Sequence, residues 1–168
     1  MQQPELFKLS SRKRPKKTTP CEWKIVPMRE CVWPYGVDVC DRPAHAVEYW
    51  HRNVATAPHY NPECECFVVL LLNSRRYIIG HHLVTIGLLD SVLVHAREVY
   101  RAAIIGAAHA VILMHNHPSG IAIPSDADIQ VTRELIRAGQ LLKIEVCDHI
   151  IVGRGQSQSL REYGCFNV

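Results

Sequence analysis

Stretches of consecutive apolar residues alternate along this chain with stretches in which apolar residues recur every three or four positions. Two continuous runs, residues 65–72 (ECFVVLLL) and 110–114 (AVILM), are short and rich in aliphatic side chains, which predicts buried strands. A turn at Asn73-Ser74 precedes residues 77–85, where another strand is predicted. The centre of the chain is therefore expected to form a sheet.

Helical spacing is found before, between and after these strands. The predicted helices cover residues 41–57, with Asp41 as N-cap and Pro43 in the first turn, residues 95–108, and a segment that opens at Pro124-Ser125 and continues to Gly139. Two short strands, residues 143–146 and 149–152, and a closing hairpin at 154–160 are predicted to follow. Helices interleaved with strands favour an α/β fold, here a three-layer sandwich with a central mixed β-sheet flanked by helices.

The positive charge is concentrated at one end of the chain. The net charge is +3, but residues 1–20 hold six Lys and Arg against Glu5 and so carry +5, which leaves −2 for the rest. We expect a disordered basic arm over residues 1–20, an extended segment over 21–40 with Trp23 and Trp33 as possible anchors, and one domain over 41–168. The arm is typical of a solvated terminus, and weak contact with nucleic-acid phosphates is the alternative.

Cysteine usage and hydropathy bear on the compartment. The seven cysteines are odd in number, form no C-x-x-C pair and follow no secretory signal, so a disulfide framework is not expected and a cytoplasmic location is. The longest apolar runs fall far short of the roughly 20 residues that cross a bilayer, and no membrane association is expected.

The end of the 110–114 strand carries the candidate chemistry. Because side chains alternate along a strand, His115 and His117 point to one side and Asn116 to the other. Ten residues separate His117 from Asp128, enough for a loop and one helical turn to return a carboxylate to the histidines. Two imidazoles and a carboxylate suit Zn²⁺, and three protein ligands leave a fourth position open for water, as in catalytic sites.

A base for that water is predicted at Glu65, an ionisable residue at the start of the most apolar strand. Each residue also has a simpler interpretation. The histidines could be hydrogen-bonded surface residues, Ser125 and Asp128 could form a helix capping box, and Glu65 could be a strand-edge carboxylate. Taken together, however, their spacings suit one open metal site.

The string H-x-H-P-x6-S-x-x-D, complete here from His115 to Asp128, resembles the JAMM motif of JAB/MPN metalloprotease domains, whose fold is cytidine-deaminase-like. More narrowly, MHNHPSG, IPSDADIQVTREL, CDHIIVG and SLREYG resemble the RadC family over residues 41–164. The resemblance implies a zinc metallopeptidase that hydrolyses amide or isopeptide bonds of a peptide or protein substrate. It implies Glu65 as acid and base and Ser125 as a stabiliser of the oxyanion.

Asp148 and His149 lie in the CDHIIVG segment, and two interpretations stay open for them. They could support the metal ligands or face the substrate, or they could only hydrogen-bond locally. The resemblance also carries an association with DNA repair, so a nucleic-acid-binding accessory protein or a metal-binding scaffold is an alternative to a hydrolase. A zinc nucleobase deaminase is disfavoured because its H-x-E and P-C-x-x-C signatures are absent.

Overall fold

The computed structural model describes residues 27–31, 39–87 and 94–166. In chain order the elements are α1 (Pro43–Tyr49), the π-helical turn η1 (Trp50–Val54), β1 (Glu65–Leu72), β2 (Ile78–Gly87), α2 (Ala96–Ile105), β3 (Ala110–Asn116), α3 (Asp126–Leu142), β4 (Glu145–Val152) and β5 (Ser157–Ser159). The strands form one sheet in the order β2-β1-β3-β4-β5, in which only β3 and β4 are parallel.

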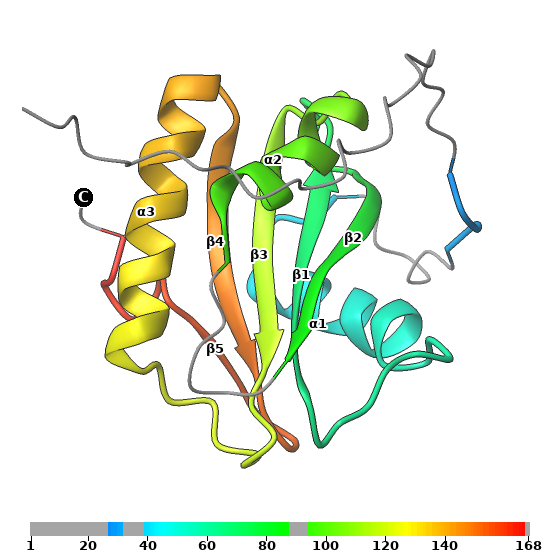
Figure 1. The fold of residues 1–168 in the computed structure, drawn as a ribbon, viewed down its shortest axis with the longest axis vertical. Helices are drawn as coiled ribbons and strands as arrows, with labels where there is room; N and C mark the ends of the chain where they lie inside the picture. Colours follow the sequence, from blue (N-terminus) through cyan, green and yellow to red (C-terminus); the bar gives the residue numbers. More distant parts are fainter. Residues whose placement is uncertain (1–26, 32–38, 88–93, 167–168) are drawn as a thin grey trace, which may run out of the picture.

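Helices cover both faces of this mixed sheet, which confirms the predicted three-layer α/β fold (Figure 1). Alternate residues of the strands face opposite sides. On one face Val68, Leu70 and Met114 pack with α1 and η1, and on the other Val69 and Leu113 pack with α2 and α3. The central strands β1 and β3 are buried along their whole length, which explains why they read as continuous apolar runs.

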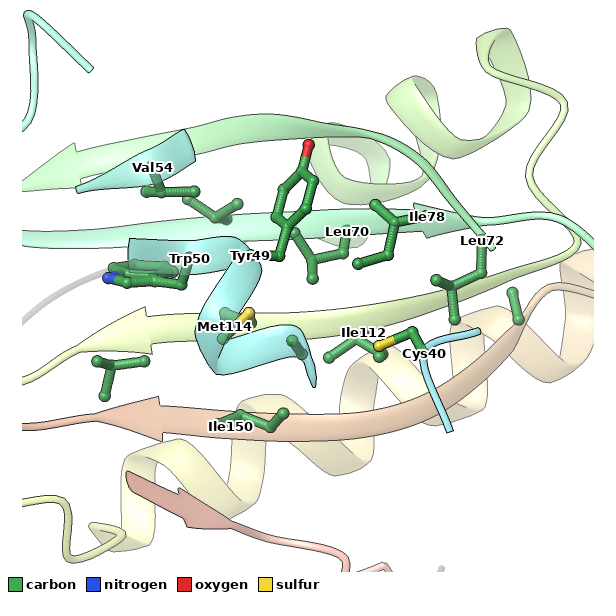
Figure 2. Close-up of a cluster of buried hydrophobic side chains, with 14 of the residues drawn as sticks. Cys40, Tyr49, Trp50, Val54, Leu70, Leu72, Ile78, Ile112, Met114 and Ile150 are labelled. Carbon is green, nitrogen blue, oxygen red and sulfur yellow. The ribbon is translucent and has the colours of Figure 1, made fainter. Parts of the chain in front are cut away.

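The α1 face is closed by two large aromatic side chains. Tyr49 and Trp50 are almost fully buried and lie over β1 and β3, near Leu70 and Met114 (Figure 2). Cys40 joins this cluster from the segment before α1. Burying side chains of this size contributes about 2 to 3 kcal/mol each, so this layer is a main source of stability.

One extra residue in β4 changes which side chains face which layer. Along the parallel β3–β4 pair, Val111 lies opposite Val146, but the next residue Ile112 lies opposite Asp148 and not Cys147. Such a bulge shifts the alternation of β4 by one position. His149 consequently lies opposite Leu113, on the face that carries α2 and α3.

Several predicted boundaries differ from the structure. Residues 143–146 and 149–152 belong to one strand, β4, because the bulge interrupts the apolar alternation without interrupting the pairing. Helix α1 begins at Pro43 with Arg42 at the N-cap position and no side-chain cap, since the Asp41 carboxylate pairs with Arg42 and His45 instead. Helix α3 continues beyond Gly139 to Leu142.

Gly139 is a close-contact position and not a helix end. A Cβ added there would overlap the carbonyl oxygen of Ile144 and lie 2.5 Å from Tyr100 Oη, which itself donates a hydrogen bond of 2.6 Å to the carbonyl of Leu135. The left-handed residue that ends α3 is Lys143, with φ 58°. Gly139 therefore lets α3 approach α2 and the start of β4.

The Gly139→Ala variant should lower the free energy of unfolding by about 1 to 3 kcal/mol, because the added methyl group overpacks the Tyr100 contact. In an unconstrained helix the same change would stabilise the protein by about 1 kcal/mol. Urea unfolding measures the difference, with the exposed Gln140→Ala in the same helix as control. A Gly139→Ala protein that is more stable than wild type would contradict this account of the packing.

The predicted basic arm and the extended segment with Trp23 and Trp33 lie almost entirely outside the described residues. Among the helices that the structure describes, none has the length and hydropathy to cross a membrane.

Candidate metal centre

Three side chains from two neighbouring elements meet at the end of the central strand. His115 is the penultimate residue of β3, His117 follows the strand, and Asp128 lies in the first turn of α3. His115 Nε2 lies 3.0 Å from His117 Nε2 and 3.1 Å from Asp128 Oδ1, and His117 Nε2 lies 3.6 Å from Asp128 Oδ2. One ligand atom from each residue lies within 4.8 Å of the others, so a single ion could contact all three.

The hydrogen bond of the His117 ring fits a metal ligand. Its Nδ1 lies 2.8 Å from the carbonyl oxygen of Ile121, which can only accept, so Nδ1 carries the proton. A neutral imidazole then has its lone pair on Nε2, the atom that faces His115 and Asp128. This nitrogen therefore faces a second imidazole nitrogen and a carboxylate, a donor set suited to Zn²⁺.

Asp128 takes part in both the helix cap and the cluster. Its Oδ2 accepts hydrogen bonds from the backbone N–H and the hydroxyl of Ser125, at 2.7 and 2.6 Å, while Ser125 Oγ accepts from Asp128 N–H, which completes a capping box. The other oxygen, Oδ1, faces His115. Burial alone would raise the pKa of Asp128, but the adjacent side chains of His115, His117 and Ser125 hold it well below its ordinary value. The carboxylate is thus ionised, as a ligand must be.

Glu65 opens β1 on the same side of the sheet as His115. Its side chain is buried, and Oε1 lies 3.8 Å from His115 Nε2. Burial raises the pKa of Glu65 above its ordinary value, and the neighbouring His115 partly opposes this rise. A carboxylate with a raised pKa holds a proton more readily, which suits a group that accepts a proton and later returns it.

Asn116 fixes the backbone around Glu65. Its Oδ1 accepts the N–H of Cys66 at 2.9 Å and its Nδ2 donates to the carbonyl of Cys64 at 3.0 Å. The two bonds bracket Glu65 in the sequence, so the side chain between His115 and His117 positions the start of β1. The strand alternation predicts Asn116 on the opposite side from the histidines but indicates no partner for it.

The other predicted residues fall in two places. Ser125 lies against Asp128, with its hydroxyl proton donated to that carboxylate. His149 lies behind His115, 2.8 Å from its Nδ1, and is fully buried, which lowers its pKa well below the ordinary value. Asp148 points to the other face and accepts bonds from Ser159 Oγ, at 2.7 Å, and from the backbone of Arg161. The structure therefore brings His149 to the cluster and not Asp148.

Comparison with known families agrees with this geometry. A family model described as RadC-like JAB domain matches residues 40–165. The chain belongs to the RadC-like JAB domain family. The resemblance seen in the H-x-H-P and CDHIIVG strings is thereby confirmed, as is the fold expected from it.

Several bacterial relatives of this RadC-like chain carry only a family designation. UPF0758 protein STH371 of Symbiobacterium thermophilum is 50% identical over 128 residues, which is 76% of this chain and 52% of that protein. UPF0758 protein tlr1707 of Thermosynechococcus vestitus is 47% identical over 98 residues, 58% of this chain and 39% of that protein. A UPF0758 protein of Staphylococcus carnosus is 41% identical over 125 residues, 74% and 53% respectively. The chain thus spans about half the length of the curated relatives it matches.

Thr132, which no sequence motif singled out, is fully buried and lies between the backbone of Asp128 and the ring of His149. It stands one helical turn after Asp128, among the apolar positions of α3. A hydroxyl at an inward-facing position four residues from a proposed ligand was the available signal.

Proposed function

We propose that this RadC-like JAB domain is a zinc-dependent hydrolase, a metallopeptidase that cleaves peptide or isopeptide bonds. The observation that carries the proposal is the convergence of His115, His117 and Asp128 with the carboxylate of Glu65 beside them. Three protein ligands leave coordination positions open, which distinguishes a catalytic from a structural zinc site.

The ligand set favours zinc over other divalent ions. Two imidazole nitrogens with one carboxylate match zinc sites in known hydrolases, whereas Mg²⁺ and Ca²⁺ prefer sets made of oxygen atoms. When bound, Zn²⁺ would lower the pKa of a coordinated water and polarise a substrate carbonyl. His115, His117 and Asp128 are the residues that would hold the ion.

The remaining residues supply proton transfer and orientation. Glu65 would accept a proton at Oε1 and later return it to the leaving amine, a role that its raised pKa and its place beside His115 support. Ser125 would stabilise the developing negative charge on the substrate oxygen. Its hydroxyl now donates to Asp128 Oδ2, so this role requires the hydroxyl to turn toward the substrate.

The proposal also covers the substrate of the protein, its compartment and its contact with nucleic acid. The substrate would be a peptide or protein, and the compartment would be the cytoplasm. Nucleic-acid contact through the basic residues 1–20, and with it a part in DNA repair, stays a prediction because those residues lie outside the described part of the chain. If that prediction is correct, binding to DNA should weaken steeply with salt and disappear when residues 1–20 are removed.

The test combines metal analysis with a substrate screen on the purified full chain. We expect about one zinc per chain, as for a single three-ligand site, and cleavage of a member of a library of linear and isopeptide-linked peptides. A chelator should abolish cleavage and added zinc should restore it. A protein that takes up no zinc after reconstitution would refute the proposal and favour a metal-free scaffold.

A further inference from the structure

Two buried histidines lie side by side behind the metal centre. His115 on β3 and His149 on β4 are both fully buried, and His115 Nδ1 lies 2.8 Å from His149 Nε2. They share one face of the sheet only because the bulge at Cys147 shifts the alternation of β4. On the far side of His149, the hydroxyl of Thr132 lies 2.5 Å from Nδ1.

The hydroxyl of Thr132 sets the direction of the hydrogen bonds. Thr132 Oγ1 also lies 2.5 Å from the carbonyl oxygen of Asp128, and two oxygens this close need a hydrogen between them. A carbonyl only accepts, so Thr132 donates its single proton to Asp128. Thr132 Oγ1 must then accept from His149, which places the proton of His149 on Nδ1.

The hydrogen bond between the two histidines then determines the position of the proton on His115. The ring of His149 is fully buried, and its two nitrogens contact the hydroxyl of Thr132 and the imidazole of His115 in the described structure, so a second proton would bury a positive charge that no carboxylate accepts by a hydrogen bond. With its one proton on Nδ1, His149 accepts at Nε2 from His115 Nδ1–H. His115 then carries its lone pair on Nε2, the atom that faces His117 and Asp128.

We propose that Thr132 and His149 are positioning residues that hold the proton of His115 on Nδ1 and so keep its Nε2 free to bind the metal. The inference rests on the metal centre of the proposed function but not on any particular substrate. Thr132 thereby has a role in the site. His149 has one too, whereas the neighbouring Asp148 accepts a hydrogen bond from Ser159 of β5 instead.

Removing the hydroxyl of Thr132 should move the ring protons of His149 and His115 to the opposite ring nitrogens. In Thr132→Val, Nδ1–H of His149 loses its acceptor inside the protein, which is costly for a buried donor. The proton can move to Nε2 of His149 and donate to Nδ1 of His115. That change forces the proton of His115 onto Nε2, where it blocks the metal.

The experiment measures tautomers and zinc affinity separately. Long-range proton–nitrogen correlation spectra of the metal-free full chain should show His115 protonated on Nδ1 in wild type and on Nε2 in Thr132→Val. Competition with a chromophoric chelator should show a 10- to 100-fold loss of zinc affinity in Thr132→Val, roughly the effect of removing other outer-shell partners. Thr132→Ser should restore both properties.

Thr56→Val is the matched control. Thr56 donates to the carbonyl of Arg52 four residues earlier, as Thr132 does to Asp128, but it is exposed and belongs to the segment after η1. This variant should leave the zinc affinity unchanged.

The outcomes separate this inference from the proposed function. Wild-type protein with His115 protonated on Nε2, or a Thr132→Val protein that binds zinc as tightly as wild type, would overturn the inference even if peptides are cleaved. The predicted tautomers and affinities with no peptide cleaved would support it while the proposed activity fails. If Thr132→Val does not fold, the wild-type spectrum and the Thr132→Ser affinity still give the answer.

Discussion

Replacing Glu65 by Gln should leave the zinc content unchanged and lower peptide turnover by about 10²- to 10⁴-fold, the usual contribution of a general acid–base group. The amide keeps the size of the carboxylate but cannot accept the proton. Zinc should stay because the candidate ligand group consists of His115, His117 and Asp128. Elemental analysis and initial rates on the peptide found in the screen measure the two quantities on the same preparation.

The matched control for this prediction is Glu63→Gln. Glu63 is exposed and lies two residues from Glu65, so the change removes an equal charge from the same segment. Its turnover should equal that of wild type. A Glu65→Gln protein with normal turnover, or a Glu63→Gln protein with the larger loss, would show that the base has been assigned to the wrong residue.

Replacing His117 by Ala should remove zinc from the protein and abolish the stabilisation that zinc provides. Zinc that binds only the folded state at about 1,000 times its Kd stabilises that state by about 4 kcal/mol. In wild type, added zinc should therefore raise the Tm by several degrees, whereas His117→Ala should show no rise. Loss of one of three protein ligands leaves two, too few for a zinc site of this type.

His109→Ala serves as the control for zinc binding. His109 is exposed, lies just before β3, and is not among the residues that could form the metal group. This variant should keep about one zinc and the full zinc-dependent rise in Tm. Undiminished zinc in His117→Ala would place the ion elsewhere and contradict the ligand assignment.

Local sequence was sufficient for most of the fold. The continuous apolar runs of β1 and β3 predicted buried strands because both faces of a central strand are covered by helices. The Ser125 and Asp128 spacing predicted the start of α3, since a capping box depends only on residues three positions apart. The alternation in β3 likewise placed His115 and His117 on one side, because that relation is fixed within the strand.

From the sequence, a capping box and a metal site are alternative explanations of Asp128, and in the structure the two are compatible. A carboxylate has two oxygens, and Oδ2 completes the cap while Oδ1 faces His115. Which oxygen serves which partner depends on how α3 lies against the end of β3. Spacing alone carries no information about that arrangement.

The sequence by itself determined the buried strands β1 and β3, the start of α3 and the set of candidate ligands, because each depends on residues close together in the chain. Only the tertiary structure decided that His149 contacts His115 while Asp148 contacts Ser159, that Asn116 holds the backbone around Glu65, and that Gly139 is a packing contact. The position of His149 depends on the bulge at Cys147, which arises from the pairing of β4 with β3. The Asn116 bonds join segments far apart in the sequence, and the Gly139 contact joins α3 to separate elements. Such relations follow from how the elements pack, which no local pattern records.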